Sequence, residues 1–306
     1  MKTAWMIFKE TIKKFVQDDP MTYSASIAFY TIFSLPAVLI IMVVVAGYFF
    51  GEAAVSGELY HQMKDLVGSN SADQIQSIIQ NASQTETGTV ATIIGIATLA
   101  FSATTVFVSI QNALNSIWKV KAKPKKGWLK LILDRVMSFT IVVTLGFLLL
   151  VSLLLEAALR IFGDYIASIT DITFNIMRFI NYGISLVVIT CVFALVFRVL
   201  PDARIRWKDV WAGAFVTTLL FTLGKYLISL YLGTSAIATT YGAAGSLVLI
   251  LVWVYYSSVI LLLGAEFTQV YSKYMGSRIE PSSHAVWIEI VEVDPDDEEH
   301  TRKVIK

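Results

Sequence analysis

Hydrophobic side chains are concentrated in six long runs that are nearly free of charge. The runs cover approximately residues 25–50, 89–110, 136–158, 178–200, 209–232 and 243–271. A bilayer core about 30 Å thick requires about 20 apolar residues in a helix, and each run is long enough. None of them alternates apolar and polar residues, as membrane β-strands do. The pattern therefore predicts an all-α, polytopic membrane protein with six transmembrane helices.

The residues before the first run show a different pattern. Trp5, Phe8, Ile12 and Phe15 recur at helical spacing, and four lysines stand among the polar positions between them. This arrangement is typical of a helix that lies along the membrane surface. We expect an amphipathic interfacial segment over residues 1–20, followed by the six-helix transmembrane domain over residues 21–275.

Lysine and arginine fall mainly on alternate segments between the runs. The N-terminal segment, residues 111–135, residues 198–208 and the C-terminal part hold 20 of the 24. Short cytoplasmic segments keep an excess of these residues, so both termini are predicted to be cytoplasmic. Residues 51–88 then form an external loop, in which Ile75, Ile78 and Ile79 predict a short surface helix.

Composition agrees with a membrane protein and excludes an ordinary soluble domain. The chain is 56% hydrophobic and 15% charged, whereas a soluble domain has about 25% charged residues. Too few charges are present to cover a water-exposed surface, so lipid is the expected solvent. The net charge of +1 favours neither nucleic acid nor an acidic partner.

Composition changes abruptly after Pro281. Five acidic residues crowd together near the end of the chain: Asp294, Asp296, Asp297, Glu298 and Glu299. This predicts an acidic, mobile cytoplasmic tail over residues 276–306. The tail and the 51–88 loop are candidate surfaces for protein partners, while the sequence leaves the oligomeric state open.

Two charges inside the predicted spans require an explanation, because charge in the hydrocarbon costs about 2.5–3.5 kcal/mol at the centre of a helix. Each charge belongs to a polar stripe at helical spacing. The first stripe, on the fifth span, consists of Thr218, Thr222, Lys225 and Ser229. The second, on the sixth span, includes Tyr255, Ser258, Glu266 and Gln269. The stripes predict either charges that lock helices together or the walls of a polar pathway between the last two spans.

A direct pair between Lys225 and Glu266 is disfavoured by depth. With a rise of 1.5 Å per residue, the two side chains lie about 16 Å apart along the membrane normal. Lys225 is expected to reach outward or to meet Glu156 at the external end of the third span. Glu266 is expected to meet a cytoplasmic arginine, for which the candidates are Arg198, Arg204 and Arg206.

The basic segment after the second span is predicted to anchor on lipid headgroups. Its candidate anchors are Lys121, Lys123, Lys125, Lys126 and Trp128. The same residues could bind RNA through charge, but attraction to anionic lipids explains them more simply. Membrane lipids are therefore the expected partners, and no nucleic acid is expected.

Several short motifs resemble the YihY/BrkB family of bacterial membrane proteins, a group formerly mislabelled as ribonuclease BN. They include residues 23–30 (YSASIAFY), 34–36 (SLP), 113–118 (ALNSIW), 200–201 (LP), 213–215 (GAF), 224–225 (GK), 241–242 (YG), 253–255 (WVY) and 264–266 (GAE), with Tyr231. The resemblance covers residues 15–275 and excludes the acidic tail. It implies a six-span protein of the bacterial cytoplasmic (inner) membrane with cytoplasmic termini, and it transfers no catalytic residue.

An enzyme is not expected from these residues. Metal-assisted phosphodiester hydrolysis needs clustered carboxylates and histidines, whereas His61, His284 and His300 are predicted to lie on opposite sides of the membrane. No catalytic residue, metal site or cofactor is predicted. The leading hypothesis is a transporter or lipid-handling protein of the bacterial envelope, and the alternative is a non-transporting scaffold for an envelope complex.

Overall fold

The computed structural model describes residues 2–51, 56–57, 59–60, 64, 72–73, 76–77, 89–123, 136, 140–141, 144, 173–234, 245–276 and 278–289. Its long helices are α1 (Lys2–Gln17), α2 (Pro20–Phe50), α5 (Thr89–Ile117), α7 (Thr173–Val199), α8 (Trp207–Thr234) and α10 (Gly245–Tyr274). Its strands are β1 (Val120–Ala122), β2 (Ala203–Arg204), β3 (Glu280–Pro281) and β4 (Ala285–Trp287). The predicted helical class is therefore confirmed for this part of the chain.

Five of the six predicted runs coincide with the helices α2, α5, α7, α8 and α10. The third run, 136–158, lies almost entirely outside the described residues. Four of the described helices, α2, α7, α8 and α10, are long and apolar enough to cross a membrane. Six spans with cytoplasmic termini remain a prediction.

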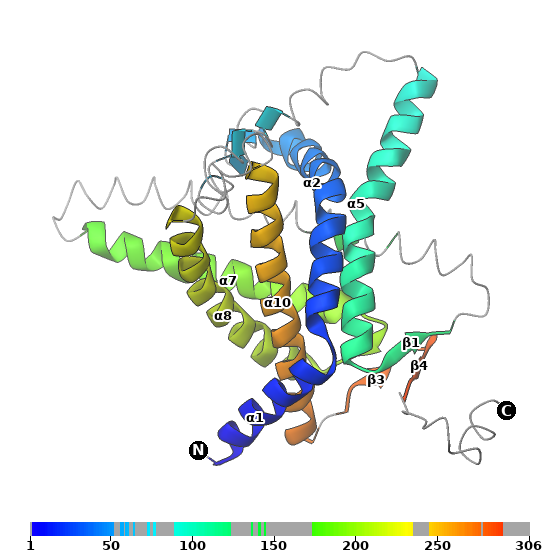
Figure 1. Ribbon diagram of the computed structural model, residues 1–306. Coiled ribbons are helices and arrows are strands. Elements are labelled where there is room, and N and C mark those ends of the chain that lie inside the picture. The colour runs from blue at the N-terminus through cyan, green and yellow to red at the C-terminus, as the bar shows by residue number, and fades with distance from the viewer. Residues whose placement is uncertain are drawn as a thin grey trace.

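Helix α10 is the central element of the described structure (Figure 1). It packs against α2 on one side and α8 on another, while α5 pairs with α2 and α7 pairs with α8. The helix α1 crosses one end of the helix bundle, which we call the base, and contacts the C-terminal part of α10 there. A buried apolar cluster at this base includes Leu114, Trp118, Phe197 and Leu262, which come from three helices and the residue after α5. The base is thus the place where most of the elements meet.

Helix α1 has two apolar sides rather than one. Ile7 and Phe15 are buried against the protein, whereas Trp5 and Phe8 are 66% and 56% exposed. The chain turns from α1 into α2 at Asp19, whose φ of 47° is left-handed, a conformation that aspartate tolerates better than most residues. The predicted helix is confirmed. Its position at the membrane surface stays a prediction, with which the exposed aromatic side chains agree.

Small residues allow α8 and α10 to approach closely. A Cβ atom added at Gly213 would lie 1.8 Å from Thr268 Oγ1, and one added at Gly264 would lie 1.9 Å from Thr217 Oγ1. Each threonine hydroxyl donates instead to a carbonyl of its own helix, at 2.7 Å in both cases. Close helix packing through small residues is typical of membrane proteins, and here it fixes how α10 sits against α8.

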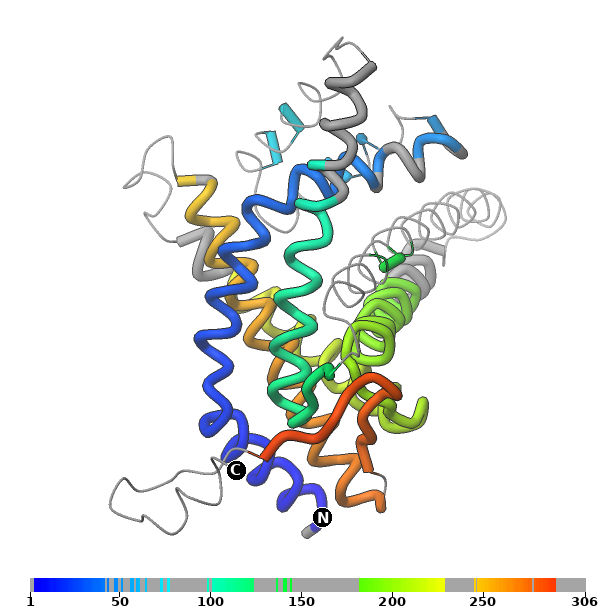
Figure 2. The backbone as a smooth tube through the Cα atoms, turned by 90° about the vertical axis from the view of Figure 1, so that its right-hand side faces the viewer, coloured from blue at the N-terminus to red at the C-terminus, as the bar shows by residue number. Residues whose placement is uncertain are grey.

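The beginning of the C-terminal segment is docked, which corrects the prediction of a mobile tail over 276–306. Strand β3 pairs antiparallel with β2, and β4 pairs antiparallel with β1. Figure 2 shows this segment in red, lying across the base of the helices. The acidic residues from 294 onward lie outside the described residues. Composition predicted the change of segment but could not show that its first residues complete two small sheets.

Candidate functional site

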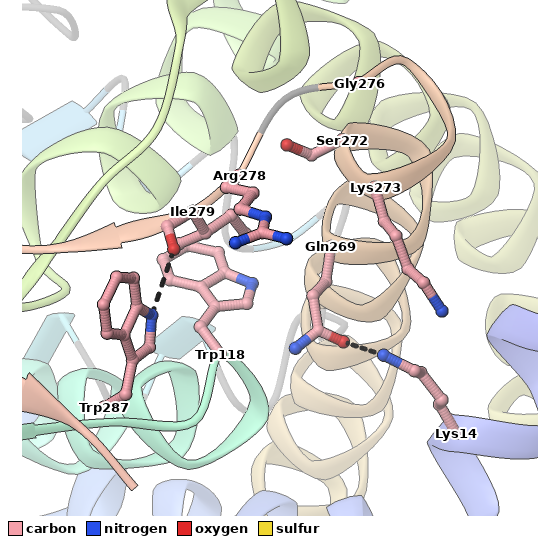
Figure 3. A pocket seen from close by; sticks show the side chains of 9 residues that line it. All are labelled: Lys14, Trp118, Gln269, Ser272, Lys273, Gly276, Arg278, Ile279 and Trp287. Carbon is pink, nitrogen blue, oxygen red and sulfur yellow. Dashed lines mark hydrogen bonds between the residues drawn. The ribbon is translucent and has the colours of Figure 1, made fainter.

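A pocket of about 540 Å³ opens at the base, where α1, the end of α5, the end of α10 and the C-terminal segment meet. We call it the base pocket (Figure 3). It is lined by Lys14, Trp118, Gln269, Ser272, Lys273, Gly276, Arg278, Ile279 and Trp287. Its volume lies within the range of about 300–1,000 Å³ that is typical of small-molecule sites. Of the residues predicted as site members, only Gln269 lines it.

Hydrogen bonds between elements hold the walls of the base pocket. Lys14 Nζ donates to Gln269 Oε1 at 2.7 Å, and Gln269 Nε2 donates to the carbonyl of Ile117 at 2.7 Å. The indole of Trp118 donates to the carbonyl of Ala265 at 3.2 Å. The side chain of Gln269 thus joins α1, α5 and α10, so the three helices position the pocket together.

Three cationic side chains give the pocket its charge: Lys14, Lys273 and Arg278. Lys273 Nζ forms an ion pair with Glu10 Oε1 at 3.0 Å. The hydroxyl of Tyr274 and the ammonium group of Lys273 hold the pKa of Glu10 below its ordinary value. In the described part of the chain, Arg278 has neither a hydrogen-bond nor an ion-pair partner. The pocket is therefore positively charged overall.

The lowered pKa of Glu10 predicts how the contact of α1 with α10 depends on pH. Because the pKa of Glu10 is lower in the folded protein than in the unfolded chain, ionised Glu10 stabilises the contact above the ordinary glutamate pKa of about 4.3. This stabilisation is lost as the pH falls through the pKa of Glu10 in the folded protein. We expect the distribution of distances between nitroxide labels at the exposed positions Lys13 and Met275 to stay unchanged down to about pH 4 and to broaden at lower pH. Glu10→Gln should remove this transition, and a transition well above pH 4.3 would contradict the assignment.

Glu266 lies on α10 one turn from Gln269, about 4.5 Å along the helix axis. Its side chain is fully buried, and neither carboxylate oxygen accepts a hydrogen bond from a described donor. The charged groups that act on it are Asp18, Lys14 and Lys119, of which Lys119 pairs with Asp18 at 2.6 Å. Ser24 and Ser34 on α2 also have buried hydroxyl groups without a hydrogen-bond partner, but Glu266 is the carboxyl group in this state among the described residues.

The prediction that Glu266 pairs with a cytoplasmic arginine is wrong. Arg198 instead donates to the carbonyl of Ile205, and its guanidinium group lies 5.4 Å from the ring centre of Trp207. Arg204 and Arg206 are exposed. The charge distribution predicted a basic cytoplasmic side, but it could not show that α1 and α5, rather than the α7–α8 connection, approach Glu266.

The two polar stripes do not face one another, which corrects the predicted pathway between the last two spans. Thr218 on α8 is joined to Thr190 on α7, with 3.1 Å between their hydroxyl oxygens, and Thr222 bonds its own helix backbone. On α10, the hydroxyl of Tyr255 donates to Met21 Sδ of α2 at 3.2 Å, and Gln269 bonds α1 and α5. Ser258 is buried and bonds its own helix. The face between α8 and α10 is occupied by the close glycine and threonine contacts.

Lys225 shares the α8 face of Thr218 and has no hydrogen-bond or ion-pair partner among the described residues. Its predicted partner Glu156 lies outside them, and so does the side chain of Ser229. Of the predicted lipid anchors, Lys121 and Lys123 are exposed near the base, while Lys125, Lys126 and Trp128 also lie outside the described residues. The headgroup role of this segment stays a prediction.

The sequence analysis missed a buried polar cluster around Asp202. Asn115 Nδ2 donates to Asp202 Oδ2 at 2.8 Å and its Oδ1 accepts from Asp202 N at 2.8 Å. His284 Nε2 lies 2.8 Å from Asp202 Oδ1, and Gln111 Nε2 lies 3.4 Å from Asp202 Oδ2. The signal was an aspartate directly after the 200–201 motif and an asparagine within the 113–118 motif. Their separation of 87 residues concealed the contact.

No group of three or more histidine, cysteine, aspartate or glutamate side chains in the described part of the chain could hold a metal ion. Apolar helices that can span a bilayer, with a charged pocket at one end of the bundle, define a polytopic helical membrane protein.

Residues 11–288 match the family described as Virulence factor BrkB, and the chain belongs to this family. The family is one of membrane proteins and is not a known enzyme family. The resemblance seen in the motifs is thereby confirmed. No solved structure matches the chain.

Relatives come from several bacteria. A UPF0761 membrane protein of Verminephrobacter eiseniae is 27% identical over 92% of this chain and 66% of its own length. The UPF0761 membrane protein YihY of Escherichia coli is 30% identical over 60% of each chain. A protein of Bacillus subtilis named as the putative ribonuclease-like protein YfkH is 23% identical over 87% of this chain and 94% of its own length. The matched region thus covers about two thirds or less of these two UPF0761 relatives.

Proposed function

We propose that this chain is a transporter or lipid-handling protein of the bacterial cytoplasmic membrane, with six spans and both termini in the cytoplasm. One observation carries the proposal. Glu266 is fully buried beside the base pocket, and its oxygens accept no hydrogen bond from described residues. A buried carboxyl group without a hydrogen-bond partner costs about 1–3 kcal/mol, which a purely structural residue would not be expected to sustain.

The surroundings of Glu266 support a role in transfer. Asp18 and Glu266 are two neighbouring acidic groups, and adjacent carboxylates repel one another when both are ionised. Such a pair readily holds one proton between them, or binds a cationic or hydroxyl group that passes. Lys119 compensates Asp18 at 2.6 Å, so the second carboxyl is left available. Glu266 does not line the base pocket, but Gln269, one helical turn away on α10, does.

Fluorescent phospholipid scrambling in liposomes tests the proposal. We expect the reconstituted protein to scramble and Glu266→Gln to lose the activity at equal reconstitution. Lys225→Met is the matched control, because it also removes a charge within a span but lies on the α8 face toward α7, away from the base pocket. Scrambling by Glu266→Gln at the original rate would show that no lipid pathway passes this carboxyl.

A wild-type protein that scrambles no faster than empty liposomes would overturn the lipid-handling form of the proposal. Transport of another solute would then be tested with the same two variants. The scaffold hypothesis makes a contrasting prediction. Both charge variants should then behave like the wild type in cells, whereas deletion of the 51–88 loop should change the phenotype.

A further inference from the structure

We propose that the base pocket binds a phosphate-ester anion, namely the headgroup phosphate of an anionic phospholipid, an inference that deepens the proposed function and rests on it. The pocket collects Lys14, Lys273 and Arg278 from three different segments. Figure 3 shows the three side chains around one opening, with Trp118 and Trp287 beside them. Three cations that converge from separate elements favour an anionic ligand over a neutral one.

Donors remain free in the pocket after the internal bonds are counted. An ammonium group has three N–H donors, and the hydrogen bonds of Lys14 to Gln269 and of Lys273 to Glu10 use one donor each. The guanidinium group of Arg278 has five donors, and none is used within the described residues. Guanidinium binds phosphate oxygens in pairs and is weakly hydrated, which makes it suited to this ligand.

Helix ends alone do not explain the three cations. Lys14 and Lys273 lie in the last turns of α1 and α10, where a positive charge is favoured by the helix dipole. Arg278 lies beyond the end of α10, in the connection from Gly276 to β3, and is exposed. It lies two residues before β3, whose pairing with β2 docks this segment at the base. A ligand anion accounts for Arg278, whereas helix capping does not.

The location of the pocket favours a lipid as the source of the phosphate. Helix α1 forms one wall through Lys14 and exposes Trp5 and Phe8 on another side. Exposed aromatic side chains on an amphipathic helix are typical of the headgroup layer of a membrane. If α1 lies in that layer, the pocket opens at the depth of the lipid phosphates. A membrane-embedded phosphodiester would therefore reach it before a dissolved ion.

Binding to the full-length protein in neutral detergent micelles tests the inference. Calorimetric titration would use three probes: dihexanoyl phosphatidylglycerol, dihexanoyl phosphatidylcholine and sodium phosphate. We expect phosphatidylglycerol to bind most tightly and Arg278→Gln to weaken it at least about tenfold, as expected for lost charge-assisted hydrogen bonds. Arg278→Lys should restore part of the affinity. Lys208→Gln is the matched control, because it removes an exposed cation on the same side of the protein outside the pocket.

Each outcome decides one point. Equal affinity of the wild type and Arg278→Gln for phosphatidylglycerol, or no binding of any probe, would overturn the site. Sodium phosphate that binds as tightly, with the same loss in Arg278→Gln, would keep the phosphate site and assign its ligand to solution. Arg278-dependent binding in a protein without scrambling would reject the proposed function while leaving the pocket's ligand in place.

Discussion

Gly264→Ala will destabilise the protein by roughly 3 kcal/mol, the upper part of the usual range for overpacking a filled core. The added Cβ would lie 1.9 Å from Thr217 Oγ1 and 2.8 Å from Thr217 Cβ. Thr217 is fully buried and bonded to the carbonyl of Gly213, so its side chain has no space into which to turn. The helices α8 and α10 must separate, and the contacts that position Glu266 and Gln269 weaken with them.

Thermal unfolding of the detergent-solubilised protein measures this effect. Gly183→Ala on α7 is the matched control, because no described atom outside the neighbouring backbone of its own helix lies within 4 Å of a Cβ added there, and alanine favours a helix over glycine. Thr217→Gly combined with Gly264→Ala should recover much of the loss, because it removes the atoms that clash. If Gly264→Ala melts at the temperature of Gly183→Ala, the close α8–α10 contact is incorrect.

Asp202→Ala will destabilise the base by about 1–3 kcal/mol, the usual cost of leaving a buried hydrogen-bonding group without its partner. The side chain of Asp202 is 1% exposed and contacts His284 at 2.8 Å. Its loss also leaves the buried amide of Asn115 without the acceptor that it contacts at 2.8 Å. Because Ser282 N donates to the carbonyl of Asp202 at 2.9 Å, the aspartate holds the C-terminal segment by both its side chain and its backbone.

Limited tryptic digestion gives a local readout of the same change. We expect cleavage after Arg278 to accelerate in Asp202→Ala, since strands β3 and β4 lose the contact between them and the helix bundle. Glu280→Ala removes an exposed acid from β3 and should leave the cleavage rate close to that of the wild type. Unchanged digestion of Asp202→Ala, together with unchanged thermal unfolding, would contradict the role of Asp202 as the residue that docks this segment.

The sequence by itself determined the membrane class, five helices and the amphipathic helix before them. These features depend on the length and spacing of apolar residues, which are local properties of the chain. The apolar spacing of Phe8 and Phe15 predicted α1 without any knowledge of its neighbours. Motifs such as those at 113–118 and 264–266 likewise indicated the family, because short motifs can be recognised from the sequence without knowledge of the fold.

Only the tertiary structure decided which polar groups meet. The depth of each residue along its helix predicted that Lys225 and Glu266 do not pair, and the structure shows no hydrogen bond between them. Periodicity, however, predicts which residues share a helix face and not which helix packs against that face. Whether Glu266 meets Arg198 or Asp18 depends on how helices pack around α10, and that packing is set by close contacts such as Gly264 with Thr217. The base pocket and the Asp202 cluster join residues far apart in the chain, so local patterns could not predict them.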